Sequence, residues 1–189
     1  MSSFSVLKYN QEKLNNHINN VNWHIERRIS LKGINSTISS YYPLKSIRYF
    51  INRYELHPIY KYNFWCIYEK DSLKSIWAVR RLIINGASIF RVVDVLGRLD
   101  DIPDLYNEIQ TILHSENAEY VDIMNYGITN DVFERMGFKE VDFLSNEIIC
   151  PNYFEPFEQK NIVIEVAYKS KEEYVAFKGD SDQDRPSIL

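Results

Sequence analysis

The sequence predicts an α+β domain with some α/β character, in which helices flank a mixed, mostly antiparallel central sheet. Residues 62–96 alternate apolar and polar side chains with a period of two, which is typical of strands. A helical apolar pattern follows at residues 102–113, and a further strand-like run follows at residues 120–126. An antiparallel meander that leads into a crossover helix and another strand makes one mixed sheet.

The residues before the meander predict further elements. Residues 21–31 alternate as a half-buried strand does, and residues 11–20 fit a helix. Pro43 suits the first turn of a helix that ends before Pro58, because a helix start needs no amide hydrogen from proline. This helix leads into the meander.

The meander is predicted from two hairpins. Residues 62–68 and 76–84 form the first pair of strands, and residues 88–96 form the third strand. Asn85-Gly86 lies between the second and third strands, and this dipeptide favours the type I′ turn of a tight hairpin. All three strands are therefore expected to be antiparallel neighbours.

The second half of the chain alternates helices and strands. Asp101 is expected to cap a helix with Pro103 at its first position, and residues 120–126 then form a strand parallel to 88–96. Thr129 is expected to cap a short helix that ends at Gly137. Residues 138–143, 162–168 and 174–177 are predicted to be extended.

The composition favours a globular protein. Of the 189 residues, 45% are hydrophobic and 25% are charged, which excludes global disorder. No apolar run reaches the roughly 18 residues of a membrane span, and the N-terminus lacks a signal-peptide pattern. Cys66 and Cys150 are far apart and outside any CxxC spacing, so reduced thiols are expected. We therefore expect a soluble, cytoplasmic protein without a membrane span.

Charge is distributed unevenly along the chain. Residues 1–60 contain 8 Lys and Arg against 3 Asp and Glu, and residues 61–189 contain 14 against 23. The positive part can guide an anionic ligand, but it is too small for a nucleic-acid footprint. We expect no nucleic-acid partner. Because His17 and His24 have no ligand spacing with a Cys or carboxylate, we also expect no metal.

Three regions are expected along the chain. Residues 1–42 form an N-terminal segment packed on the main domain, residues 43–178 form the main domain, and residues 179–189 form a polar, acidic tail. Such a tail is disordered by composition alone, but its carboxylates also suit a segment folded against the basic first part. We hypothesise that the tail is ordered and that Asp184 and Arg185 line a substrate cleft.

Several stretches carry a family resemblance. Residues 130–141 read NDVFERMGFKEV, a short helix that ends in a Gly-Phe step into a strand. The element order from about Pro43 onward and this step are similar to the GNAT N-acetyltransferase superfamily. The runs IICPNYFEPF at 148–157, KGDSDQDRP at 178–186 and Leu56-His57-Pro58 further resemble GNAT-like proteins of bacterial surface-polysaccharide gene clusters. The resemblance covers roughly three quarters of the chain.

The resemblance implies an N-acyltransferase. It would transfer an acetyl group from acetyl-CoA to an amine of a sugar or sugar nucleotide in surface-polysaccharide synthesis. The alternative is a non-catalytic module of the same fold that binds a saccharide or a partner protein. Similar peptidoglycan aminoacyl-transferases use this fold without the CoA loop, so the loss of CoA alone does not exclude acyl transfer.

The resemblance also implies where CoA would bind. In this family, amides of a glycine-rich loop hold the CoA pyrophosphate at a helix N-terminus. The matching positions here are Val95, Leu96, Gly97 and Arg98. Pro103 removes an amide donor, and Asp100, Asp101 and Asp104 would repel a phosphate, so we predict weak CoA binding. The same carboxylates also suit a helix start.

The chemistry of acyl transfer selects two candidate catalytic residues. Asp94 is expected on the strand face that carries Phe90, Val92 and Leu96, where apolar surroundings would raise its pKa and make it a base. The alternative is a structural Asp that accepts backbone amides. Tyr126 follows as the acid for the leaving thiolate, with core packing as its alternative.

The candidate substrate-binding residues are near the same strand ends. Asp122 and Asn125 belong to the run that ends at Tyr126, where open sheets usually hold ligands. His57 enters the meander at the sheet edge, and its alternative role is to pack against Tyr60. A structural role is also open for Asp122, because acids in strands often serve hydrogen-bond networks.

Overall fold

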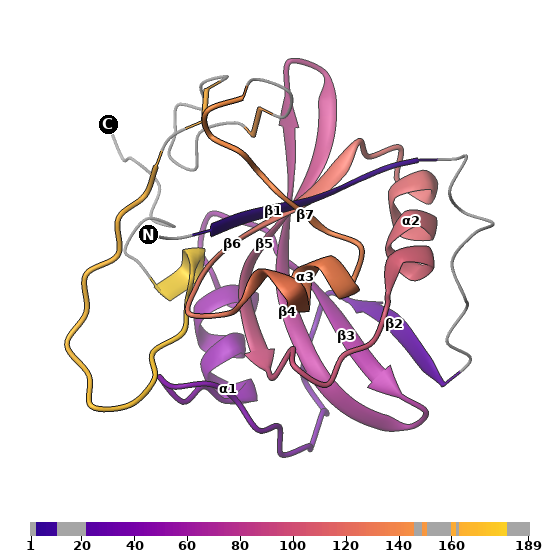
Figure 1. The fold of residues 1–189 in the computed structure, drawn as a ribbon. Helices are drawn as coiled ribbons and strands as arrows, with labels where there is room; N and C mark the ends of the chain where they lie inside the picture. The colour runs from indigo at the N-terminus through magenta and orange to yellow at the C-terminus, as the bar shows by residue number, and fades with distance from the viewer. Residues whose placement is uncertain (1–2, 11–21, 146–148, 151–159, 162, 181–189) are drawn as a thin grey trace.

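The computed structural model describes residues 3–10, 22–145, 149–150, 160–161 and 163–180, and its elements surround one open sheet (Figure 1). The strands are β1 (Ser3–Lys8), β2 (Trp23–Arg28), β3 (Asn63–Glu69), β4 (Ser72–Ile84), β5 (Ala87–Gly97), β6 (Tyr120–Tyr126), β7 (Lys139–Glu140) and β8 (Ala176–Phe177). The helical elements are α1 (Ile47–Phe50), the π-helical η2 (Ile51–Glu55), α2 (Tyr106–Ser115), α3 (Asn130–Arg135) and the 3-10 turn η3 (Lys178–Asp180).

The sheet confirms an α+β fold with a mixed, mostly antiparallel sheet. Its order is β2-β3-β4-β5-β6-β1-β7, and β8 pairs with β6 away from this path. Only the β5–β6 pair is parallel among the named strands. This parallel pair follows the crossover through α2, as the sequence predicted.

The meander β3-β4-β5 confirms the hairpin prediction. Asn85 and Gly86 have φ values of 51° and 85°, and a type I′ turn requires such positive values at both central positions. The strand predicted at 21–31 is β2, which pairs antiparallel with β3. The helix predicted at 11–20 lies outside the described residues.

The β6 side of the sheet differs from the prediction. Residues 138–143 were expected to form the closing strand, but only β7 is a strand there, and it pairs with β1. β1 itself lies antiparallel between β6 and β7. The six-residue strand β1 therefore takes the place beside β6. Long-range pairing decides which strand lies there, because the local pattern of a single short strand does not specify its neighbour.

Two helices begin later than predicted. α1 begins at Ile47, where the side chain of Ser46 accepts a hydrogen bond from the Tyr49 amide at 3.1 Å. α2 begins at Tyr106, whose amide donates to an Asp104 carboxylate oxygen at 2.7 Å. Pro43 and Pro103 thus lie in the loops that precede these helices, and Asp101 does not cap α2.

Alternating side chains of the strands build apolar layers on both faces of the sheet. Trp65, Trp77 and Val92 pack with residues of α2 and α3. Phe64 and Ala78 point to the other face and pack with residues of α1 and η2. Phe4 and Met124 extend this second face beside β1 and β6 in a further cluster. Figure 1 shows α1 on the opposite side of the sheet from α2 and α3.

Candidate functional site

The strands β5 and β6 pair over only part of their length. Phe90–Val92 pair with Val121–Ile123, and the pairing stops there. A register shift in the β4–β5 pair lies at the same place, since Ala78 pairs with Asp94 while Val79 pairs with Val92. Such a bulge bends a strand and re-aims its side chains. The carboxyl ends of β5 and β6 therefore diverge.

The bulge changes the face on which Asp94 lies. Asp94 was expected beside Phe90 and Val92, but those two belong to the α2 and α3 side of the core. Asp94 instead hydrogen-bonds Tyr54, which packs with Leu96 in the other layer. A strict period of two could not foresee this, because the extra bulge residue reverses the alternation.

Asp94 is fully buried within a polar cluster. Its carboxylate accepts hydrogen bonds from Lys45 Nζ, from Tyr54 Oη at 2.6 Å and from the Val95 amide at 2.8 Å. Burial raises the pKa of Asp94 to about 6, against the opposing effect of Lys45. The raised pKa that the sequence analysis expected is present, but the carboxylate does not face an open cleft.

A segment near the C-terminus fills the space where β5 and β6 diverge. We call Ala176–Asp180, which comprises β8 and η3, the inserted segment. It pairs antiparallel with β6, with Phe177 opposite Asn125. Its Asp180 carboxylate accepts hydrogen bonds from Lys45 Nζ at 2.7 Å and from the Phe177 amide at 2.9 Å. The inserted segment thus joins the Lys45 cluster to the end of β6.

Gly179 shows how closely the inserted segment covers Asp94. A Cβ atom at this position would lie 2.2 Å from Tyr54 Oη and 3.2 Å from the Asp94 Cβ atom. The Gly179 carbonyl also accepts a hydrogen bond from Arg53. Only glycine permits this approach of the backbone. The inserted segment therefore covers Asp94, the candidate catalytic base.

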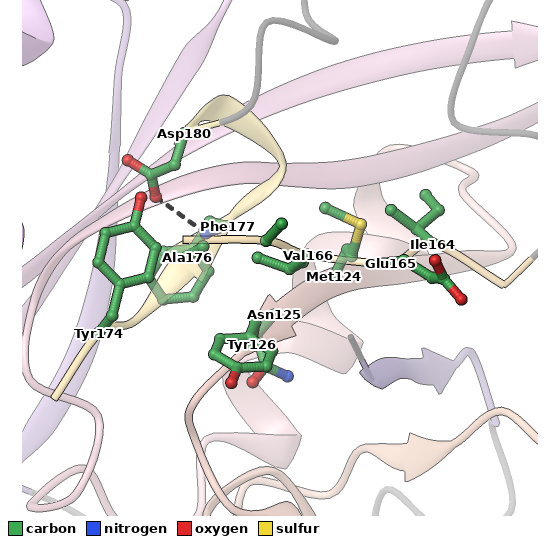
Figure 2. A pocket seen from close by; sticks show the side chains of 11 residues that line it. Met124, Asn125, Tyr126, Ile164, Glu165, Val166, Tyr174, Ala176, Phe177 and Asp180 are labelled. Carbon is green, nitrogen blue, oxygen red and sulfur yellow. Dashed lines mark hydrogen bonds between the residues drawn. The ribbon is translucent and has the colours of Figure 1, made fainter. Parts of the chain in front are cut away.

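Two hollows lie beyond the end of β6, and Tyr126 lines both. The smaller hollow, the apolar pocket, has a cavity volume of 200 Å³ and lies between the end of β6, residues 164–167 and the inserted segment. The larger hollow, the tyrosine groove, has a volume of 970 Å³ and lies between residues 40–44, the β6–α3 connection and residues 172–175. Tyr174 also lines both hollows. Figure 2 shows Tyr174 and Tyr126 on the border of the apolar pocket.

Five tyrosines line the tyrosine groove, and four of their rings contact one another. Tyr168 stacks on Tyr174, with ring centroids 4.8 Å apart, and meets Tyr126 edge to face at 5.4 Å. Tyr42 meets Tyr174 edge to face at 6.3 Å. A hydrogen bond to Tyr168 and then burial raise the pKa of Tyr126 above its ordinary value, so the phenol holds its proton more firmly than a free tyrosine.

The charged side chains of the groove are mostly acidic. Arg98 forms an ion pair with Asp100 at 3.0 Å and lies over the Tyr41 ring. Glu172 and Glu173 also line the groove. The positive charge of Arg98 is thus offset within the groove, which leaves an acidic surface around the tyrosine rings.

The residues matched to a CoA loop do not fit a pyrophosphate. Val95 and Leu96 are buried in the core, and a Cβ atom at Gly97 would lie 2.6 Å from the Lys74 carbonyl oxygen. Two amides of the following loop are engaged, because Leu99 donates to Tyr41 Oη at 2.8 Å and Ile102 donates to the Leu99 carbonyl. Since α2 begins only at Tyr106, the matched residues also lie away from the helix start at which amides would hold a phosphate.

The remaining candidates are placed in different surroundings. Asp122 is buried and binds Arg91 in the sheet, and Asn125 donates to Ser3 Oγ at 2.8 Å while it lines the apolar pocket. His57 Nδ1 accepts from the Tyr60 amide at 2.9 Å, and its ring stacks on Tyr60. His57 lies outside both hollows.

The tail hypothesis is tested only at its first residues. Asp180 contacts Lys45, as expected for a carboxylate against the basic N-terminal part. Asp184 and Arg185 lie outside the described residues. Sequence reasoning missed Lys45, Tyr168 and Tyr174 as members of these clusters. Each contacts a residue far away in the chain, and no local pattern marks them.

Other kinds of site find little support in the described part of the chain. There, no group of three or more His, Cys, Asp or Glu side chains is placed to hold a metal ion. Among the described helices, none has the length and apolar character to cross a membrane. Cys66 and Cys150 are free and buried, and burial raises the pKa of each thiol to about 12.

Comparison of the chain with protein-family models, with curated proteins and with solved structures finds no match.

Proposed function

We propose that this protein is a non-catalytic, GNAT-like module that binds a saccharide in the tyrosine groove. One observation carries the proposal: the space between the diverging ends of β5 and β6 is filled by the inserted segment, which covers Asp94. An enzyme that used Asp94 as its base would need substrate to reach it. The open surface lies instead at the groove beyond Tyr126.

The groove has the features that a saccharide requires. Its volume of 970 Å³ lies within the range of about 300–1,000 Å³ typical of ligand sites. The exposed rings of Tyr168 and Tyr42 offer flat apolar faces for sugar C–H groups. The carboxylates of Glu172 and Glu173 offer acceptors for hydroxyl groups. Its acidic surface makes a neutral glycan a better ligand than a phosphate-bearing one.

N-acyl transfer to an amine of a sugar or sugar nucleotide is the second candidate. The observation that favours it is the Asp94 carboxylate, whose pKa of about 6 is close to the value useful to a general base. Against it stand the late start of α2 at Tyr106, away from the CoA-matched residues, and the cover of Asp94.

A glycan array of neutral oligosaccharides, followed by calorimetry with the best ligand, tests the proposal. Tyr168→Ala should weaken binding about tenfold, because it removes one stacked ring from the groove. The matched control is Tyr68→Ala. It removes a tyrosine of β3 that stacks on His24 of β2, away from the groove. Glycan binding that Tyr168→Ala leaves unchanged would contradict the proposed groove.

Titration with CoA separates the two candidates. We expect weak binding at most, because each uncompensated carboxylate near a pyrophosphate costs on the order of 1 to 4 kcal/mol. Submicromolar CoA affinity together with no retained glycan on the array would favour the acyltransferase and overturn the binding module.

A further inference from the structure

We infer that the tyrosine groove and the apolar pocket form one two-part site for a saccharide that carries an N-acyl amino sugar, with the acyl group in the apolar pocket. This inference rests on the proposed function and names the ligand class. It starts from the position of Tyr126 and Tyr174, which line both hollows. A sugar ring on these tyrosines would therefore hold its substituent at the mouth of the pocket.

The size of the apolar pocket limits what it can hold. Its 200 Å³ corresponds to the liquid volume of about six or seven water molecules. A nucleotide is too large for such a space. A small side group of a sugar, such as an acetamido group, fits it.

The walls of the pocket select an apolar end. Met124, Val166 and Phe177 contribute apolar surface, and Figure 2 shows Val166 beside Met124 along the pocket. A methyl group gains from leaving water for such surroundings, whereas a hydroxyl group would lose hydrogen bonds to water there. These walls favour an N-acetyl group over the hydroxyl group of a plain hexose.

The polar atoms of the pocket match an amide. Asn125 and the carboxylates of Glu165 and Asp180 also line it. A carboxylate accepts the N–H of an acetamido group, whereas the Asn125 amide already donates to Ser3 Oγ and accepts from the Ile128 amide. Lys45 already pairs with Asp180 and Asp94. The pocket thus presents acceptors without an unpaired cation among its described lining residues, which disfavours uronic acids and sugar phosphates.

Matched glycans on the array test the inference. Each pair differs only in one group, with an N-acetylhexosamine in one member and the corresponding hexose in the other. We expect the N-acetyl member to bind about tenfold more tightly, from methyl burial and one further hydrogen bond. Calorimetry with the best pair gives the two dissociation constants.

A pocket-filling variant assigns the preference to the apolar pocket. Val166→Phe should abolish the N-acetyl preference while hexose binding in the groove persists, since Val166 lines only the pocket. The matched control is Val163→Phe on the same segment, because Val163 is exposed and lines neither hollow. Thermal melting of both variants checks that each one folds.

The possible results separate the inference from the proposed function. Equal binding of both members of each pair, or an N-acetyl preference that survives Val166→Phe, overturns the N-acyl site while glycan binding itself stands. Tighter binding of de-N-acetylated glycans also overturns it, because the carboxylates would then select an amine. Absence of any glycan binding overturns both proposals.

Discussion

The two halves of the β5–β6 pair are held together in different ways. In the first half the strands pair directly, and Arg91 of β5 binds Asp122 of β6 with two nitrogen atoms at 2.8 and 2.9 Å. In the second half the strands diverge, and Lys45 binds both Asp94 of β5 and Asp180 of the inserted segment. Both halves bury charge, but only the first joins the two strands through their own side chains.

The two halves also differ in how the buried cation is bound. In the first half, loss of the Asp122 carboxylate removes a buried anion that binds the guanidinium of Arg91 through two nitrogen atoms. In the Lys45 cluster, loss of one carboxylate leaves the ammonium group with the other. We therefore expect the first half to be sensitive to single charge changes and the second half to be sensitive to the packing of the inserted segment.

The largest expected effect follows from Asp122→Asn. The variant removes a buried carboxylate that is paired with Arg91, whose side chain is 1% exposed, and should lower the free energy of unfolding by about 3 to 5 kcal/mol. Urea denaturation measures the change. The double variant Arg91→Met with Asp122→Leu removes both charges and should recover most of the loss. A loss below about 1 kcal/mol for Asp122→Asn would contradict the role of this pair.

A smaller effect is expected from Gly179→Ala in the second half. The new Cβ atom would lie 2.2 Å from Tyr54 Oη, which is held by its bond to Asp94, so the variant should lose about 1 to 3 kcal/mol through overpacking. Urea denaturation again gives the value. Tyr54→Phe removes the obstructing oxygen, so the two changes together should cost less than the sum of their separate effects. If the losses in free energy of unfolding from the two changes were strictly additive, the inserted segment would make no steric contact with Tyr54 in the variant.

Local sequence patterns predict some strands of the sheet but not all of their neighbours. The meander, the Asn85-Gly86 turn and the parallel strand β6 follow from local apolar patterns and turn chemistry. The place of β1 beside β6 does not follow from such local patterns, because the β6 residues that pair with β1 are more than 100 residues away in the chain. Short strands leave such long-range pairing open in a single sequence.

The candidate site was harder to predict than the fold. Asp94 and Tyr126 were found from their places at strand ends, and both lie near the diverging strands. Their surroundings depend on the β5 bulge and on the inserted segment, neither of which has a local sequence signal. A polar residue can thus be located on a strand while its exposure stays undetermined, because a bulge reverses the side-chain alternation.

The smallest effect at neutral pH is expected from Asp94→Asn. Burial raises the pKa of Asp94 from 3.8 to about 6, so the folded state holds a proton more firmly than the unfolded chain does. The stability from this group is therefore fully present below about pH 4 and is lost as the pH rises through about 6. At pH 7 the charged form gains nothing from folding, and its removal should change stability by about 1 kcal/mol or less, provided that Asp180 keeps Lys45 paired.

Urea denaturation of the wild type and Asp94→Asn from about pH 4 to about pH 7 checks this expectation. The difference in stability between the two proteins should shift in favour of Asn as the pH rises, because only the wild type must bury a carboxylate at position 94. Asp180→Asn serves as the control, since it removes the other carboxylate of Lys45 and leaves the burial of Asp94 in place. A pH-independent difference, or a loss at pH 7 as large as that of Asp122→Asn, would show that the two halves bury their charges in the same way.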